Sequence, residues 1–356
     1  MNFPKLFACA VLVTTSAVLI SCGGSSSQGI SPLPVTDVYV AGWEMSNSAG
    51  GSAMVWKNGT PVASWFNPSA QFEAIAVSGS DVYVAGTANP ARTLRDQVMY
   101  WKNGVPVALT DGTQVALAKA IFVQGKDVYV AGGYGGVGPN LAAAYWKNGV
   151  PVPLTDGTQL ALAFAIQVVG PDVYVAGYEN KQIMVSPGSY TLYSAAKYWK
   201  NGVVVDLTDG TNPAEALSLF VSGPDVYTAG FACNSTAGDC LQAVYWKNGV
   251  PTSLASAGTI ATSIAVTDSD VFAAGDLRTG GMLLWKDGAV SSLAGSGYTE
   301  QSQVVVSGQD VYVAGVQQLP GGGFHAGYWK NTVAVPLTED PNTAQSAATS
   351  IAVVTH

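Results

Sequence analysis

The side chains that could hold another molecule are chiefly aromatic rings outside the regular sequence pattern. Tyr and Trp rings offer a flat apolar face for stacking and a polar edge for hydrogen bonding, which suits sugars and peptides. The alternative interpretation is that these rings close the ends of a hydrophobic core. The candidate ligand-binding residues are Trp43, Tyr134, Tyr178, Tyr190, Tyr193, Phe231, Tyr298 and Phe324.

Residues suited to catalysis are few. The only histidines are His325 and His356, so a histidine-rich metal site is excluded and no metal is expected. No G-x-S-x-G elbow or other nucleophile motif is present. Glu73 and Lys119 form either a salt bridge or an acid–base pair. These residues favour a protein that is not an enzyme, and no cofactor is expected. The carboxylates that a hydrolase or lyase would need are limited to Glu73, Asp276 and Glu300.

The N-terminus has the composition of an export signal. Lys5 is the only charge in residues 1–21, and an apolar stretch follows it. Leu19-Ile20-Ser21-Cys22 resembles a bacterial lipobox, which implies that Cys22 receives a diacylglyceryl group. Residues 22–36 then form a lipidated Cys and a flexible tether. Gly23, in place of Asp, indicates sorting to the outer membrane. The alternative is an ordinary secretory signal in which Cys22 is incidental.

An exported, lipid-anchored protein folds where disulfides can form. Cys233 and Cys240 lie seven positions apart around a Gly-containing segment, and we predict that they form a disulfide. A zinc site is a weaker interpretation, because two thiols without a nearby histidine do not complete one.

The charge of the chain excludes some partners. Without residues 1–21 the chain keeps 14 basic and 23 acidic residues, a formal charge near −9. Nucleic acid is therefore not an expected partner, because its binding needs clustered Lys and Arg. The expected partners are the membrane, through the N-terminal lipid, and a glycan or envelope protein.

These candidate residues are set within a sequence repeat. Asp-Val-Tyr-Val-Ala-Gly or a close variant occurs seven times, at spacings of 40 to 53 residues. Tyr-Trp-Lys-Asn-Gly follows most copies about twenty residues later. Self-similarity at this period is typical of repeat folds. The motif begins at Asp37, Asp81, Asp127, Asp172, Asp225, Asp270 and Asp310.

Each repeat predicts four short antiparallel strands. In the fourth repeat these are residues 165–169, 173–176, 195–200 and 203–207, which we name a to d. Asn201-Gly202 between c and d predicts a type I′ turn, because both positions of that turn need positive φ. Four such strands make one propeller blade.

The sequence therefore predicts an all-β fold, a seven-bladed β-propeller over residues 37–356. The chain ends in an unpaired a-type strand at 349–354. We expect this strand to complete the first blade, residues 37–66, and close the ring. The Trp that recurs in strand c is expected to fill the space between blades. The repeated Asp is expected to bond amides of the a–b turn, and the Lys after the Trp to hold its ammonium in water.

The strand order also predicts where a site lies. The a–b and c–d turns are short and uniform, whereas the b–c and d–a connections vary and carry the aromatic candidates. Variable loops on a rigid scaffold commonly bind ligands, so the b–c/d–a loop face is the expected functional face. Near the axis, the inner strands begin with dissimilar residues, namely Glu73, Lys119, Phe164, Leu217, Thr262, Ser302 and Thr349.

The repeats resemble those of uncharacterised, secreted bacterial β-propeller lipoproteins with a Tyr-Trp-Lys-Asn-Gly motif. This resemblance covers residue 37 to the C-terminus and implies no particular activity. Three functions stay open. The first is a membrane-anchored extracytoplasmic module that binds glycan or protein through the b–c/d–a loop face. The others are an envelope-assembly or protein-interaction scaffold and a propeller hydrolase or lyase.

Overall fold

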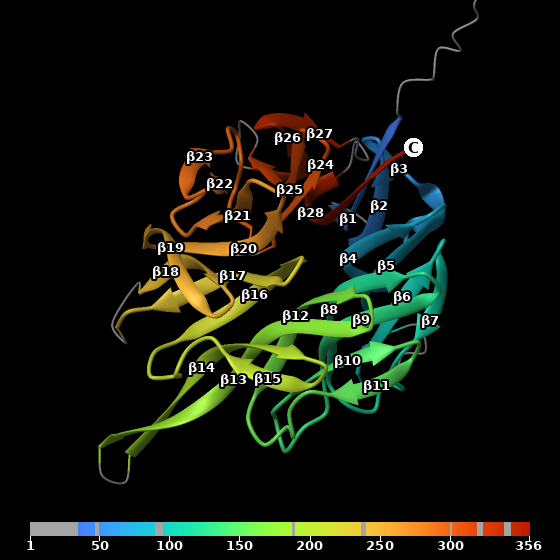
Figure 1. Ribbon diagram of the computed structural model, residues 1–356. Coiled ribbons are helices and arrows are strands. Elements are labelled where there is room, and N and C mark those ends of the chain that lie inside the picture. The colour runs from blue at the N-terminus through green and yellow to red at the C-terminus, as the bar shows by residue number, and fades with distance from the viewer. Residues whose placement is uncertain are drawn as a thin grey trace, which may run out of the picture. The chain divides into compact units, whose positions relative to one another are not determined.

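The repeats fold into sheets arranged around a common axis. The computed structural model describes residues 35–46, 50–89, 95–186, 189–235, 240–299, 301–318, 323–337 and 343–356. These residues form seven four-stranded antiparallel sheets (Figure 1). They are the seven blades of a β-propeller, as the repeats predict. Within the described ranges, no helix has the length and apolar character needed to cross a membrane.

The blades are numbered along the chain, and strands a to d run outward from the axis. Blade 1 has β28 (Thr343–Thr355), β1 (Thr36–Ser46), β2 (Gly50–Lys57) and β3 (Thr60–Pro61), and the 3-10 helix η1 (Ala63–Trp65) follows. Blade 2 has β4 (Ala70–Ser78), β5 (Asp81–Ala88), β6 (Gln97–Lys102) and β7 (Val105–Ala108). Blade 3 has β8 (Ala116–Gln124), β9 (Asp127–Tyr134), β10 (Ala142–Lys147) and β11 (Val150–Pro153).

The other four blades follow the same order. Blade 4 has β12 (Ala161–Val169), β13 (Asp172–Ser186), β14 (Ser189–Lys200) and β15 (Val203–Asp206). Blade 5 has β16 (Ala214–Ser222), β17 (Asp225–Cys233), β18 (Leu241–Lys247) and β19 (Val250–Ala257). Blade 6 has β20 (Thr259–Val266), β21 (Val271–Leu277), β22 (Met282–Lys286) and β23 (Ala289–Ser292). Blade 7 has β24 (Gln303–Ser307), β25 (Asp310–Gln318), β26 (Phe324–Lys330) and β27 (Val333–Pro336).

The c–d turns have the backbone that Asn-Gly predicts. Asn148 and Gly149 have φ of 51° and 85°, the left-handed values of a type I′ turn. Blade 7 departs from this rule, because Thr332 stands in place of the glycine with φ of 69°. A β-branched residue is strained in that conformation.

The core consists of seven clusters between neighbouring blades, and the repeated Trp lies in them as predicted. Trp146 of blade 3, for example, packs with Tyr83 and Val98 of blade 2. Six of the seven rings are essentially inaccessible to solvent, and Trp101 is 3% exposed. Each ring therefore contributes the burial of a large apolar surface to an interblade contact.

The repeated Asp has a different role from the one predicted. Asp81 accepts hydrogen bonds from Asn103 Nδ2 (2.8 Å) and Lys102 Nζ (2.7 Å) rather than from amides of the a–b turn. Asn103 Oδ1 in turn accepts from Val82 N–H at 2.9 Å. The prediction is wrong because the left-handed Asn, directly after strand c, lies beside the start of strand b and directs its side chain to it. The Asp therefore joins strand b to the c–d turn.

The Lys before the turn keeps its side chain in contact with water, as predicted, since Lys102 is 47% exposed, and it has protein partners as well. Lys102 Nζ lies 5.3 Å from the centroid of the Tyr83 ring while it pairs with Asp81. The ammonium is therefore held by a carboxylate and an aromatic face. Hydrogen bonds from Lys102 and Asn103 lower the pKa of Asp81. All seven blades carry this Lys over the strand b ring.

The C-terminal strand closes the ring as predicted. β28 is the innermost strand of blade 1 and pairs antiparallel with β1. Val35 and His356 exchange two backbone hydrogen bonds, of 3.1 and 2.9 Å, at the end of this pairing. Ile351 of β28 is almost completely buried. Strands from the two ends of the propeller therefore share one blade.

Candidate functional site

A β-bulge interrupts six of the seven inner strands. In blade 3, for example, the register of β8 and β9 shifts between Ala118 and Ala120, so Lys119 is left without a cross-strand partner. A bulge turns its side chain out of the regular alternation. We name the skipped residues, together with Ser302 just before β24, the bulge ring. Its members are Glu73, Lys119, Phe164, Leu217, Thr262, Ser302 and Thr349.

The bulge explains the glycine that ends the repeated motif in six of the seven blades. A Cβ on Gly132 would lie 1.8 Å from the Leu117 carbonyl oxygen and 3.1 Å from Ala118 Cα. The bulge therefore brings the backbone of strand a so close to strand b that only glycine fits. The same close approach occurs at Gly42, Gly86, Gly177, Gly230 and Gly275.

The bulge ring surrounds an axial cavity of about 680 Å³, and all seven of its residues line it. Lys119 Nζ lies 3.2 Å from Glu73 Oε2, so these residues form the salt bridge that was one of the two predicted alternatives. Gln301 Nε2 donates to the same carboxylate oxygen at 2.8 Å. This salt bridge gives the cavity a charged side on blades 2 and 3, and Glu215 and Arg278 also line the cavity.

The other sides of the bulge ring differ in chemistry. Phe164 and Leu217 present apolar side chains from blades 4 and 5. The Thr262 and Ser302 hydroxyls hydrogen bond to each other. Thr349 Oγ1 donates to the carbonyl oxygens of Ala41 and Phe72, at 3.1 and 3.0 Å. The ring is thus divided into charged, apolar and hydroxyl-bearing arcs.

Glu215 of β16 also lines the cavity, and the sequence interpretation did not identify it. Burial raises the pKa of Glu215 to about 7, against a hydrogen bond from Ser194 of blade 4 that lowers it. Its repeat equivalents include the apolar Leu117, Leu162 and Ile260. A carboxylate at a position that is apolar in blades 3, 4 and 6 was the signal that could have revealed it.

Three predicted ligand-binding residues meet in a recess beside the cavity. Trp43 of β1, Phe324 of β26 and Tyr298 between blades 6 and 7 line this recess, which measures about 360 Å³. Gln301 and Thr349 line both the recess and the axial cavity, and so does Tyr298. The recess, which we name the rim recess, and the axial cavity are therefore neighbouring parts of one surface.

The other aromatic candidates are dispersed. Tyr134 packs on Trp146, with ring centroids 5.4 Å apart. This ring therefore matches the alternative interpretation, in which the aromatic side chains close the ends of a hydrophobic core. Tyr178 stacks on Phe164 at 5.9 Å, and burial raises the pKa of Tyr178 to about 12. Phe231 lines the axial cavity. The structure thus brings three of the eight candidates into the rim recess and places the rest elsewhere.

The long b–c connection of blade 4 is a pair of strands rather than the predicted loop. β13 and β14 continue to pair past Met184 opposite Tyr190, as far as Ser186 opposite Ser189, and Figure 1 shows them as a long hairpin. That prediction is wrong because cross-strand hydrogen bonding goes on beyond the blade core. Tyr190 and Tyr193 lie on β14 in this hairpin, which we name the arm, and Tyr190 is 53% exposed.

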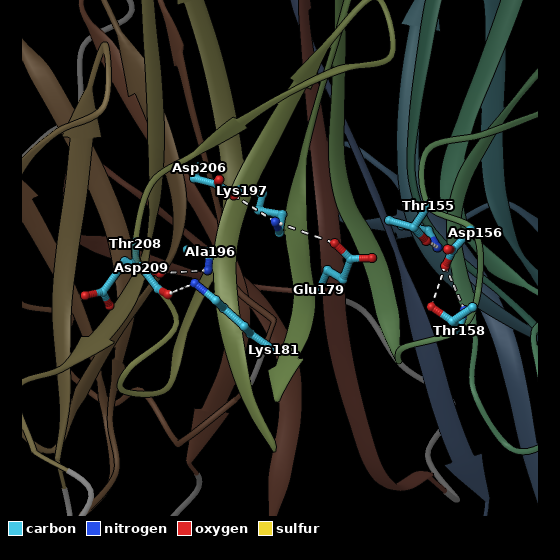
Figure 2. A network of polar contacts seen from close by, with 11 residues as sticks. Thr155, Asp156, Thr158, Glu179, Lys181, Ala196, Lys197, Asp206, Thr208 and Asp209 are labelled. Carbon is cyan, nitrogen blue, oxygen red and sulfur yellow. Dashed lines mark hydrogen bonds and ion pairs between the residues drawn. The ribbon is translucent and has the colours of Figure 1, made fainter. Parts of the chain in front are cut away.

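Polar contacts fix the base of the arm (Figure 2). Lys197 Nζ lies 2.7 Å from Asp206 Oδ1 and 3.5 Å from Glu179 Oε2. Lys181 Nζ donates to the Asp209 carbonyl oxygen at 2.6 Å. These contacts tie strands b and c of blade 4 to strand d and to the connection that leads into blade 5.

The Thr-Asp-Gly-Thr segments form ordinary turns. Asp156 Oδ1 accepts from the Thr158 amide at 2.9 Å and from its hydroxyl at 2.7 Å (Figure 2). This is an Asx-type turn, and these bonds lower the pKa of Asp156. In the part of the chain that the structure describes, no three His, Cys, Asp or Glu residues are grouped as metal ligands.

The remaining candidates have separate positions. Cys233 and Cys240 are joined by a disulfide with their Cα atoms 4.8 Å apart. Asp276 is buried, and its carboxylate accepts a hydrogen bond from the Thr299 backbone amide at 3.1 Å. This contact is structural. Cys22, residues 1–21 and Glu300 lie outside the described residues.

Comparisons with known proteins place the fold only. No protein-family model matches the sequence, and no curated protein is significantly similar to it. The β-propeller domain of the Trilobed protease from Pyrococcus furiosus is a similar solved structure, with 8% identity and a TM-score of 0.54 over 86% of this chain and 93% of that one. Such low identity supports the propeller fold and nothing further.

Two other solved structures are similar. The acylaminoacyl peptidase of Pyrococcus horikoshii has 10% identity and a TM-score of 0.50, and the match covers 85% of this chain and half the length of that one. The putative TolB of Agrobacterium tumefaciens has 12% identity and a TM-score of 0.42, over 76% of this chain and 92% of that one.

Proposed function

We propose that this protein is a membrane-anchored extracytoplasmic module that binds a glycan on its b–c/d–a loop face. The observation that carries the proposal is the rim recess, where Trp43, Tyr298 and Phe324 line one hollow. Aromatic faces pack against the C–H faces of sugars, and nearby amides and hydroxyls bond their hydroxyl groups. Gln301, Thr299 and Gln345 supply such polar groups in the recess.

A protein-binding scaffold is the second candidate, and the arm favours it. Met184, Tyr190 and Leu192 of the arm are 58%, 53% and 53% exposed. The register places Met184 opposite Tyr190 and Gln182 opposite Leu192, so all three apolar side chains share one face of the hairpin. Exposed apolar clusters of this kind commonly mark protein contacts.

A glycan array probed with the full chain tests the first proposal. Trp43→Ala is expected to reduce binding roughly tenfold or more through loss of stacking. Tyr190→Ala is the matched control, because it removes an aromatic ring from the arm and leaves the rim recess intact. Binding that survives Trp43→Ala would contradict the glycan proposal.

A pulldown from an envelope lysate with the same variants separates the two candidates. A stoichiometric partner lost with Tyr190→Ala and kept with Trp43→Ala would favour the scaffold. Loss with Trp43→Ala alone would place the contact in the rim recess.

The membrane anchor has its own experiment. Cys22→Ser removes the thiol that would carry the lipid, so the protein is expected to move from the membrane pellet to the soluble fraction of the cell envelope. Labelled fatty acid incorporation should be lost at the same time. A variant that still pellets after a high-salt wash would count against the lipid anchor.

A further inference from the structure

The inner strands of neighbouring blades are joined by side chains that cap backbone amides. In each case the capped amide is the backbone N–H of the residue two positions after a bulge-ring residue. This N–H points out of its own sheet, toward the preceding blade. In blade 2 the Ile75 amide donates to Ser350 Oγ of blade 1 at 3.0 Å. The other capped amides are Ile351 with Gln303, Ile264 with Ser218 and Val304 with Ser263, at 2.8, 3.1 and 3.0 Å.

Blades 3, 4 and 5 lack this cap. The residues that face their equivalent amides are alanines, and a methyl group accepts no hydrogen bond. Among the described residues, no side chain on another strand is seen to accept from these amides. The uncapped amides and the alanines that face them are Ile121 with Ala74, Ile166 with Ala120 and Leu219 with Ala165.

The cross-strand register shows that these positions are equivalent. Ile121 stands opposite Val130 as Ile75 stands opposite Val84, and the same pairing holds for Ile166 and Leu219. The three amides therefore point as the capped ones do, toward the gaps between inner strands at the wall of the axial cavity. They belong to three consecutive blades and so form one arc.

The bulge ring adds an ammonium and two apolar side chains to this arc. Lys119 belongs to blade 3, Phe164 to blade 4 and Leu217 to blade 5, and all three line the axial cavity. The Lys119 ammonium gives one contact to Glu73, which leaves N–H groups for another acceptor. Backbone amides and an ammonium together suit a carboxylate, because charge-assisted hydrogen bonds are stronger than neutral ones.

We propose that the arc on blades 3 to 5 binds a small carboxylate with an apolar body. The carboxylate accepts from the uncapped amides and from Lys119, and the body packs on Phe164 and Leu217. A cavity of about 680 Å³ is within the usual size of small-molecule sites. In the opposite arc the equivalent amides are capped by side chains of the preceding blade. Arg278 of blade 6 also lines the cavity. The proposal does not depend on glycan binding at the rim recess.

The ligand could be a plain organic acid or an amino acid, since Glu73 lies beside Lys119 and could receive an α-ammonium. The test is calorimetric titration of the full chain with 3-phenylpropionate, its methyl ester and phenylalanine. Saturable binding of either carboxylate, with no binding of the ester, is the expected result. Phenylalanine binding more tightly than phenylpropionate would identify the amino acid as the preferred form.

Alanine-to-serine variants test the uncapped amides directly. Ala120→Ser and Ala165→Ser supply the hydroxyl that Ser218, Ser263 and Ser350 already carry, so the fold is expected to be kept, as thermal unfolding can check. Each variant should weaken carboxylate binding roughly tenfold by occupying a donor. Ser263→Ala, which uncaps an amide on the opposite arc, should change it less than about twofold.

The outcomes separate this proposal from glycan binding. Ala120→Ser and Ala165→Ser should leave glycan-array binding unchanged, whereas Trp43→Ala should leave carboxylate binding unchanged. Absence of saturable carboxylate binding would overturn the proposal, as would equal binding of the ester or undiminished binding in the Ala120→Ser, Ala165→Ser double variant.

Discussion

At the scale of single residues, the repeated glycine of blades 1 to 6 is required by the bulge beside it. Gly132→Ala would place a Cβ 1.8 Å from the Leu117 carbonyl oxygen, so the two strands would have to separate. We expect the free energy of unfolding to fall by about 3 kcal/mol or more, as for other severe steric changes in a core. Urea unfolding measures this change.

Gly51→Ala is the control for that substitution. The nearest atom to its Cβ is the Glu44 carbonyl oxygen, at 3.9 Å, so alanine fits in this strand. The change in stability should lie within about 0.5 kcal/mol of zero. Equal losses at Gly51 and Gly132 would contradict the steric explanation.

Glu215 gives the protein a distinct pH dependence. Burial raises its pKa from 4.5 to about 7 in the folded state, so the folded protein binds this proton more tightly than the unfolded chain. The associated stability is therefore fully present below about pH 4.5 and is lost as the pH rises to about 7. The repeated Asp residues do not obscure this pH dependence. Their pKa values are lowered in the folded state, so their contribution to the free energy of unfolding changes only in more acid solution.

Glu215→Gln should remove this dependence. Between pH 4.5 and pH 7.5 the wild type should lose about 2 kcal/mol relative to the variant. Chemical unfolding of both proteins at several pH values measures the difference, and other titrating groups cancel in it. Parallel curves for the two proteins would show that Glu215 titrates normally.

At the scale of elements, the blade 7 turn is strained where the others are not. Thr332 has φ of 69° at a position that glycine holds in the other blades. Thr332→Gly should raise the free energy of unfolding by roughly 1 kcal/mol, because it removes a left-handed β-branched residue. The reciprocal variant Gly149→Thr should cost a similar amount, since its Cβ meets no atom within 4 Å. If both variants destabilise the protein, backbone strain is not the cause.

The elements also show how far the sequence could lead. Strands b, c and d, the Asn-Gly turns and the closing strand follow from alternation, turn residues and the position of the last repeat unit. The bulges do not, because the dissimilar residues of the inner strands mark the positions but do not reveal that these residues lack a cross-strand partner. Likewise, the arm was interpreted as a loop because its pairing beyond Glu179 depends on cross-strand contacts that local composition does not reveal.

The candidate site was predicted in part for the same reason. Trp43, Tyr298 and Phe324 stood out as rings outside the repeat, but their meeting in one recess depends on how blades 1 and 7 come together at ring closure. The uncapped amides of blades 3 to 5 are backbone groups, which leave no mark in the sequence until the register is known. The alanines that face them are ordinary in a β-strand.

At the scale of the whole molecule, stability depends on ring closure. Removal of the last eight residues, from Thr349 onward, takes away the buried Ile351 and the part of β28 that pairs with residues 36–41 of β1. The ring should then open, and thermal unfolding should become broad and shift well below that of the full chain. Deletion of His356 alone is the control and should have little effect. A sharp, unshifted transition in the longer deletion would contradict this dependence.

The shared blade has a consequence for the order of events during synthesis. Blade 1 receives its inner strand from β28, which leaves the ribosome after all the other strands. Until then β1 presents an unpaired edge, however well the six later blades have formed. The first blade to be made is thus the last to be finished, and any chain that stops early exposes a strand that is ready to pair with another molecule.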